Sequence, residues 1–213
     1  EDFFSQSGYE AEGPLLYGFS KWLNKGFKTN KIDKIFFLSR DGKIMLKAYK
    51  KLYKDPHAKY MYASRKAFII PSLWLNPTVQ YIRHAISWPT EGSIASFLKR
   101  IGVTPDSYVD IYNRYGFNMN CAYTYGNLFK DDKFLDIFSK FIKSEMIANS
   151  HAQFDLLVQY LKQLDFKGNV AIVDIGWYGH MQAALQKVIC AAKLDVKLFG
   201  YYIGLRHDST VLN

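Results

Sequence analysis

Four consecutive residues, Ser39-Arg40-Asp41-Gly42, are suited to binding a phosphate group. They follow the apolar run Ile35–Leu38 and precede a helical pattern. Backbone N–H groups at the start of a helix are unpaired and carry partial positive charge, so they attract anions. Gly42 would let a phosphate approach the main chain, Ser39 can donate to it, and Arg40 can chelate it. Asp41 suits a base or a hydroxyl acceptor, or it simply caps the helix.

A second corner of the same design lies near the end of the chain, where Asp174–Gly179 follows the apolar run Val170–Val173. Asp174 could orient a sugar hydroxyl, bind a metal ion together with phosphate, or act as a general base. The residues after it form a predicted tight loop whose aromatic rings could stack on a ligand or pack internally: Gly176, Trp177, Tyr178 and Gly179. His180 follows directly, but a lone histidine is more often structural.

A third polar corner, Ser64-Arg65-Lys66, repeats the Ser-Arg pair after another predicted strand. Its charges together with Arg40 would suit a strongly anionic ligand, such as a diphosphate or a sugar phosphate. The alternative is a surface corner with solvated charges. Arg206-His207-Asp208, after the last predicted strand, could add charges to the same edge. Asp41 and Asp174 are the candidate catalytic residues, and no metal ligands are assigned.

The elements that must position these corners are strands followed by helices. Continuous apolar runs predict buried strands at 34–39, 59–63, 170–173 and 196–203, and helical spacing predicts helices at 43–53 and 180–192. Such β-α-β units have parallel strands, and open sheets of this kind bind ligands at the carboxyl ends of their strands. We therefore expect an α/β fold, Rossmann-like, with three layers and a mostly parallel sheet.

A long helical insertion is expected between strands two and three. One domain has its core at about 13–66 and 167–206, and the insertion or cap covers about 67–166. Its predicted helices begin after Asn76-Pro77, at Ile94, near Tyr108, at Lys133 and at Gln153, and 113–127 is predicted to be a loop. An insertion of this length is commonly a lid over a site.

The N-terminal region predicts one helix that packs on the sheet. Residues 1–12 are polar and aromatic and are expected to be a linker or a frayed end. The following helix has an apolar face made of Leu15, Leu16, Phe19, Trp22 and Leu23. A lysine stripe marks the helix at 43–53. It is ordinarily a solvated face, and the alternative is a binding face.

Composition limits the partners and the compartment. The net charge of +9 comes from lysines spread over several segments, without a nucleic-acid-binding signature, so nucleic acid is a minor interpretation and anionic metabolites fit better. Cys121 and Cys190 lie in apolar neighbourhoods and are expected to be core residues in a reducing compartment. No membrane-spanning run or signal peptide is evident, so we expect a cytoplasmic chain, peripheral to the inner membrane face if it binds a membrane at all, and excised from a longer protein.

Several motifs are absent from the sequence. It has no GxGxxG, no GxxxxGK[ST], no GxSxG and no HExxH, so nicotinamide, flavin, P-loop and zinc signatures are missing, whereas Mg²⁺ stays compatible. Asp-x-Asp is also absent. That absence argues against one large glycosyltransferase class and against an aspartyl-nucleophile phosphatase motif within this chain.

Four segments in order carry a resemblance to a known bacterial family: Gly13–Leu23, Phe37–Gly42, Tyr62–Ala67 and Val173–Gly179. They resemble the region after the phosphatase-like domain in predicted hydrolases of the haloacid dehalogenase (HAD) superfamily, found with surface-polysaccharide and glycosyltransferase genes. The resemblance covers nearly the whole chain. Because the nucleophile motif is missing here, the resemblance implies a companion domain of an upstream hydrolase rather than the hydrolase itself.

A weaker similarity links Ser39–Gly42 and Asp174–Gly179 to type I phosphoribosyltransferases. That family usually has two adjacent acidic residues where this chain has Asp174 alone, followed by Trp177 and Tyr178. The leading hypothesis is a sugar-phosphate or nucleotide-sugar binding domain in surface-polysaccharide biosynthesis, with group transfer or phosphoester chemistry if it is catalytic. The alternatives are a non-catalytic module that docks on a glycosyltransferase or a membrane face, and a phosphoribosyltransferase-like enzyme.

Overall fold

The computed structural model describes residues 2–86, 90–207 and 209 of the 213-residue chain. They form two compact units, which are described separately. One unit comprises Glu1–Ala63, Lys162–Gln182 and Lys193–Asn213, and contains the main sheet. The other comprises Ser64–Leu161 and Ala183–Ala192, and is mainly helical. We call them the sheet unit and the helical unit.

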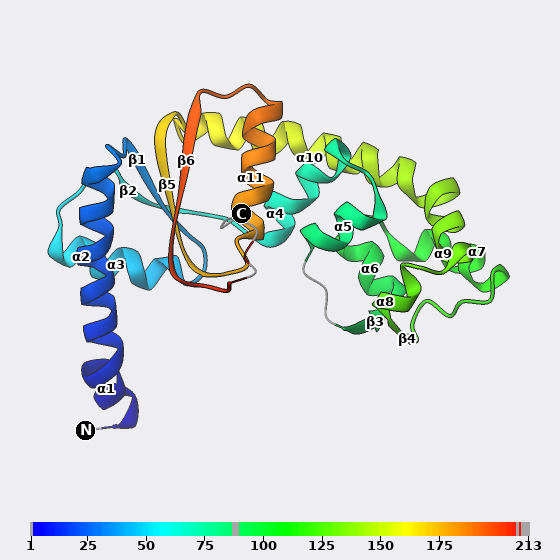
Figure 1. Cartoon of the computed structure of the whole chain (residues 1–213), viewed down its shortest axis with the longest axis horizontal. Coiled ribbons are helices and arrows are strands. Elements are labelled where there is room, and N and C mark those ends of the chain that lie inside the picture. Colours follow the sequence, from blue (N-terminus) through cyan, green and yellow to red (C-terminus); the bar gives the residue numbers. More distant parts are fainter. Residues whose placement is uncertain (1, 87–89, 208, 210–213) are drawn as a thin grey trace. The chain divides into compact units, whose positions relative to one another are not determined.

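The sheet unit is built on four parallel strands in the order β2-β1-β5-β6 (Figure 1). Their bounds are β1 Lys34–Leu38, β2 Ala58–Met61, β5 Gly168–Trp177 and β6 Val196–Leu205. The register pairs Leu38 with Met61 on one side of β1, and Phe37 with Val173 on the other. The expected α/β class with a Rossmann-like, largely parallel sheet is confirmed.

Helices α2 (Gly13–Thr29) and α3 (Gly42–Leu52) pack on one face of this sheet. Successive side chains of a strand alternate between its faces. Ile35 and Phe37 therefore join the core formed with the two helices, whereas the Phe36 ring stacks on Phe166 with centroids 5.1 Å apart. Burial on both faces explains why the β1 sequence is continuously apolar.

The N-terminal segment is helical, contrary to the linker expected for residues 1–12. A helix α1 (Phe3–Ser7), a π-helical turn (Gly8–Glu12) and α2 follow one another without a break (Figure 1). Asp2 caps the start of α1, because its carboxylate accepts hydrogen bonds from the Phe4 and Ser5 N–H groups. The mixed polar and aromatic sequence of this segment has no clear helical periodicity, so the capped helix was not predicted.

The predicted apolar face of α2 is only partly correct. Phe19 and Leu23 are buried, but Leu15 and Trp22 are each about half exposed. The buried face instead continues through Ser20 and Phe27. Helix α2 has a glycine at position 26 because the Tyr201 ring packs closely there: a Cβ on Gly26 would come within 2.6 Å of that ring.

The helical unit contains more elements than the sequence predicted. Its segments are α4 Arg65–Ile69, the 3₁₀ turn Ile70–Leu75, α5 Val79–Ala85, β3 Glu91–Ser93, α6 Ile94–Arg100, the 3₁₀ turn Pro105–Tyr108, α7 Val109–Arg114, β4 Ala122–Thr124 and α8 Tyr125–Leu128. Then α9 Asp132–Ile137, a π-helical turn Phe138–Ile142 and α10 Lys143–Gln163 run on continuously, where two helices were expected. The predicted loop at 113–127 contains β4, which pairs antiparallel with β3.

The helical unit has its own apolar core. Phe97 and Phe134 are fully buried there, with ring centroids 5.6 Å apart. Cys121 and Cys190 are both exposed, so the prediction that they are core residues was wrong. Apolar neighbours in sequence did not indicate burial: Cys121 lies in an exposed bend just before β4, and Cys190 lies on an exposed side of α11 (His180–Ala191) near its end. Within the described residues, no helix is long and apolar enough to cross a membrane.

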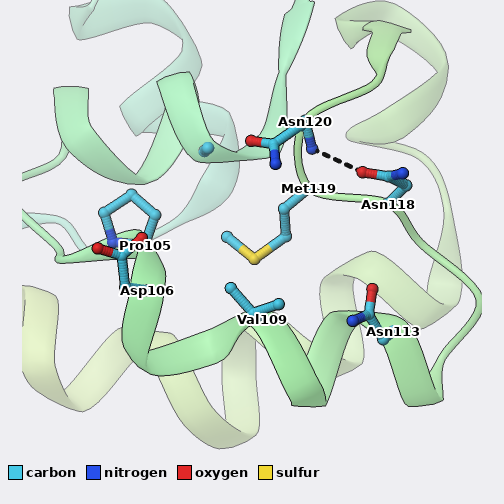
Figure 2. Close-up of a pocket in the computed structure, with 8 residues that line it drawn as sticks. Pro105, Asp106, Val109, Asn113, Asn118, Met119 and Asn120 are labelled. Atoms are coloured by element: carbon cyan, nitrogen blue, oxygen red, sulfur yellow. Dashed lines mark hydrogen bonds between the residues drawn. The ribbon is translucent and has the colours of Figure 1, made fainter.

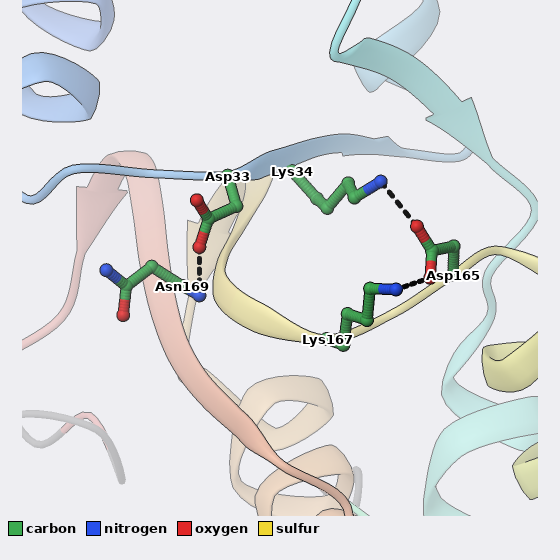
Figure 3. Close-up of polar contacts among 5 residues, drawn as sticks. All are labelled: Asp33, Lys34, Asp165, Lys167 and Asn169. Atoms are coloured by element: carbon green, nitrogen blue, oxygen red, sulfur yellow. Dashed lines mark hydrogen bonds and ion pairs between the residues drawn. The ribbon is translucent and has the colours of Figure 1, made fainter.

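A polar cluster fixes the amino-terminal edge of the sheet (Figure 3). The Asp165 carboxylate pairs with Lys34 Nζ at 2.7 Å and with Lys167 Nζ at 2.9 Å. Beside it, the Asn169 N–H donates to Asp33 Oδ2 at 2.8 Å. These contacts join the start of β5 to the start of β1, at the edge opposite the candidate site.

We expect Leu23→Ala to lower the free energy of unfolding by about 2–5 kcal/mol, because it removes a fully buried side chain from the core beneath α2. Leu15→Ala is the matched control in the same helix and should change it by less than about 0.5 kcal/mol, because Leu15 is half exposed. Urea unfolding of both variants measures the difference. Equal losses would contradict the burial assigned to α2.

The Asp165 cluster predicts an acid-sensitive contribution to stability. Lys34 and Lys167 lower the pKa of Asp165 from 3.8 to about 2. A lowered carboxyl pKa contributes stability that is present above the unfolded pKa and lost as the pH falls toward 2. Asp165→Asn should therefore lower the Tm at neutral pH, and the difference from wild type should disappear between about pH 4 and 2. Asp195→Asn, an exposed control just before β6, should leave the Tm at neutral pH unchanged in thermal melts.

Candidate functional site

The carboxyl edge of the sheet has its topological switch point between β1 and β5. From β1 the chain moves outward to β2 on one side, and it later returns to β5 on the other side before moving to β6. Loops that leave two adjacent strands in opposite directions open a crevice there, which is the usual ligand position in open α/β sheets. The Ser39–Gly42 corner follows β1 and Asp174 follows the last β1-paired residue of β5, so both border this point.

Ser39 ties together the ends of β1 and β2. Its hydroxyl donates to the Ala63 carbonyl at 2.5 Å, and its Oγ accepts from the Ala63 N–H at 2.8 Å. The peptide bond between Ser39 and Arg40 is cis. Because the Ser39 hydroxyl donates its proton to Ala63, this side chain holds the ends of β1 and β2 together. The predicted hydrogen bond from Ser39 to a phosphate would require breaking this contact.

Arg40 and Asp41 lie exposed at the start of α3. Asp41 occupies the N-cap position of α3, but its side chain makes no capping hydrogen bond, so helix capping does not explain an aspartate at this position. Gly42 is buried, and a Cβ there would lie 2.8 Å from the backbone of Phe37. The glycine thus allows α3 to pack against β1 whether or not a phosphate approaches.

Ser64, Arg65 and Lys66 belong to the helical unit. Ser64 caps α4, because its Oγ accepts from the Ala67 N–H at 3.0 Å. Arg65 and Lys66 are exposed in the first turn of that helix. The first residue of the triplet therefore has a capping role, and the other two present positive charge to solvent.

The segment from Asp174 to Trp177 is strand rather than the predicted loop. β5 continues beside β6, with Gly176 opposite Gly204 and Trp177 opposite Leu205. Gly176 has φ +117°, and a Cβ on it would overlap the Gly204 carbonyl oxygen, so no other residue fits without a backbone shift. Trp177 follows with φ +94° and is 63% exposed. The predicted tight turn is thus a strand extension that displays an indole ring.

Asp174 is buried on the face opposite the α2–α3 core, because it alternates with Val173 along β5. Tyr202 is its register partner on β6, and the Tyr202 hydroxyl donates to Gln182 Oε1 at 2.6 Å. Burial first, and the negative charge of Asp174 second, raise the pKa of Tyr202 well above its ordinary value. This tyrosine therefore stays protonated and remains a hydrogen-bond donor.

Tyr178 forms contacts within the sheet unit after β5 ends. Its ring stacks on His180 with centroids 5.2 Å apart, and the Arg206 guanidinium lies 5.0 Å from the ring centre. The Tyr178 carbonyl also accepts from the Ser209 hydroxyl. Tyr178 is thus engaged in packing, and Gly179, at φ +74°, turns the chain into α11. Asp208 lies outside the described residues.

The arrangement can bind an anion and an aromatic or sugar ring. Arg40 and the α3 N-terminus supply positive charge on the β1 side, and Trp177 supplies an exposed ring on the β5 side. Asp41 is the exposed carboxylate, and Asp174 is the buried one. Among residues 2–86, 90–207 and 209, no cluster of three or more His, Cys, Asp or Glu side chains could hold a metal ion.

A pocket of about 250 Å³ lies elsewhere, in the helical unit (Figure 2). Apolar and polar side chains share its wall: Ala95, Pro105, Asp106, Val109, Asn113, Asn118, Met119 and Asn120. The Asn118 carboxamide oxygen accepts from the Asn120 N–H at 3.0 Å, and the Met119 carbonyl accepts from the Ala95 N–H, so the 118–120 loop is held in place. Sequence reasoning missed this pocket. The asparagines of the predicted 113–127 loop were its only signal.

No protein-family model matches the chain, and no curated protein matches it. Its function is therefore argued from the geometry of the sheet edge.

We expect Gly176→Ala to destabilise the sheet unit by about 1–3 kcal/mol, because its Cβ meets the Gly204 carbonyl and its φ disfavours a side chain. Gly204→Ala is the matched control across the ladder, where a Cβ meets open space, and should change stability by less than about 0.5 kcal/mol. Thermal melts followed by circular dichroism measure the stability of both variants. Tolerance of Gly176→Ala would show that the strand extension is not a rigid feature.

Proposed function

We propose that the carboxyl edge of the sheet binds a sugar phosphate or a nucleotide sugar. One observation carries the proposal: the switch point between β1 and β5 is bordered by an exposed arginine at a helix start and by an exposed tryptophan on the extended strand. Arg40 and the first N–H groups of α3 would hold the phosphate. Trp177 would stack on the base or on the sugar ring.

The two carboxylates would have different roles. Asp174 is buried beside Tyr202, which suits orienting a ligand hydroxyl rather than exchanging protons with solvent. Asp41 is exposed, which suits a general base. If the domain is catalytic, group transfer follows: Asp41 takes the proton of an attacking hydroxyl, the new bond forms at the transferred group, and the phosphate leaves with the bonding electrons.

The biological setting belongs to the same proposal. The resemblance to the region beside HAD-like phosphatase domains supports a role in bacterial surface-polysaccharide biosynthesis in the cytoplasm. An upstream hydrolase domain or a glycosyltransferase would be the partner. Phosphoribosyl diphosphate stays in the ligand panel, because a helix start at a strand end also suits a diphosphate.

The experiment is a thermal-shift screen, followed by calorimetric titration, of nucleotide sugars, sugar phosphates, phosphoribosyl diphosphate and inorganic phosphate, with and without Mg²⁺. A ligand at a hundred times its Kd should add about 2.7 kcal/mol to the free energy of unfolding. Arg40→Ala should weaken binding by about tenfold to a hundredfold, because a charge-assisted hydrogen bond is lost. Arg83→Ala, an exposed arginine of α5, is the control and should bind as wild type does.

Two results would contradict the proposal. One is a panel without any hit for the folded wild-type protein. The other is a hit that Arg40→Ala and Trp177→Ala leave unchanged, which would place the ligand elsewhere, with the 118–120 pocket the first position to test. A hit restricted to phosphoribosyl diphosphate would favour the phosphoribosyltransferase-like alternative instead.

A further inference from the structure

The positive charge of this chain is concentrated in one continuous segment. Residues 13–54 contain eleven lysines and arginines and only two acidic residues, a net charge of +9. The whole chain also has a net charge of +9, so the remaining residues are balanced. Lysines occur throughout the sequence, as their spread suggested, but their excess lies entirely in α2, β1, α3 and the adjoining turns.

The lysines of this segment lie along the outer sides of two helices. Helix α2 exposes Lys21, Lys25 and Lys28, at the spacing of one helix face. Helix α3 exposes Lys43, Lys47, Lys50 and Lys51 within an arc opposite its buried residues Met45 and Tyr49. Neither helix contains an acidic residue.

Both helices pack on the same face of the sheet, through a shared core that includes Leu23 and Met45. They also touch each other, since Tyr49 of α3 reaches Asn24 of α2. Their outer sides therefore form one surface, which we call the basic face: Lys21, Lys25, Lys28, Lys43, Lys47, Lys50 and Lys51. The ion pairs found among the described residues involve none of these lysines.

Apolar side chains border the basic face. Trp22 is 51% exposed although its ring stacks on Phe19, and Ile44 is 52% exposed beside Lys43. Leu15 and Tyr17 of α2 are also half exposed. Lysines with flanking tryptophan and aliphatic residues on helices are typical of surfaces that lie in the headgroup region of a bilayer.

We propose that the basic face docks the protein on an anionic lipid bilayer. The partner is diffuse negative charge rather than a shaped anion, because all seven cations are lysines, which act as point charges and lack the bidentate fork of arginine. Nucleic acid fits less well, because Trp22 and Ile44 flank the lysines and do not form a stacking platform among them. The inference concerns a surface separate from Arg40 and Trp177, so it does not depend on the proposed ligand.

The test is co-sedimentation of the purified chain with vesicles of phosphatidylcholine alone or with about 30 mol% phosphatidylglycerol. We expect binding only to the anionic vesicles, and loss of that binding as the salt concentration rises toward about 0.5 M. The variant Lys21→Glu/Lys25→Glu/Lys47→Glu/Lys51→Glu should reduce the partition coefficient by at least about tenfold. Trp22→Ala should reduce it by a smaller factor.

The matched control is a second variant with the same change in net charge, made at lysines outside the basic face. Lys99→Glu/Lys130→Glu/Lys133→Glu/Lys162→Glu has the same net charge as the first variant but leaves the basic face intact, since these four exposed lysines lie outside it. It should keep at least half of the wild-type partition coefficient. A glutamine version of the first variant replaces it if circular dichroism shows that charge reversal unfolds the helices.

Three outcomes would overturn the proposal. The first is equal binding of wild type to neutral and anionic vesicles, or none to either. The second is an equal loss in the two glutamate variants, which would make total charge the cause. The third is tighter binding to duplex DNA or to an acidic polypeptide than to anionic vesicles at the same salt concentration. The ligand screen described above, run without lipid, is independent of all three.

Discussion

Strand β1 is the element on which the sheet unit depends, because it is hydrogen-bonded on both sides and buried on both faces. It pairs with β2 over four residues and with β5 over four residues, both in parallel. Phe36 and Phe37 are fully buried on opposite faces. Because both faces of a central parallel strand are buried, its side chains are apolar along its length, and polar residues lie beyond its ends. The Lys34–Asp165 pair marks one end, and Ser39–Gly42 marks the other.

The same constraint explains why the two edges of the sheet differ. At the amino edge, the polar side chains already have structural partners: contacts of Asp33, Asp165 and Asn169 set the register of β5 against β1. At the carboxyl edge the Ser39 hydroxyl performs the comparable task for β2, through both backbone groups of Ala63. Arg40 and Asp41, the next residues, have no such task and are exposed. A polar residue with a structural role, Ser39, is thus followed directly by two polar residues exposed to solvent.

Much of this architecture could be predicted from the sequence, because apolar runs report burial directly. The four strands, α3 and α11 were predicted to within a few residues except at the carboxyl end of β5. There the sequence Asp174-Ile175-Gly176-Trp177 contains turn residues, but β6 supplies a partner strand as far as Leu205, and tertiary pairing overrides the local preference. Tertiary contacts likewise decide which apolar residues of α2 are buried, since Leu23 joins the core beneath the helix whereas Leu15, in the same helix, is half exposed. The 118–120 pocket needs contacts between Met119 and Ala95 that no local pattern encodes.

Helix α3 links the candidate site to the basic face, because the two surfaces use different parts of the same helix. It connects the carboxyl end of β1 to the start of β2, so its N-terminus lies at the sheet edge while its lysine stripe runs along its length. A bilayer covering the outer side of α2 and α3 would therefore leave the edge between β1 and β5 at the margin of the contact. A phosphate held by Arg40 would add negative charge at one end of the stripe, within about one Debye length of Lys43. The two proposals together predict that ligand binding and membrane attachment oppose each other weakly, through charge alone.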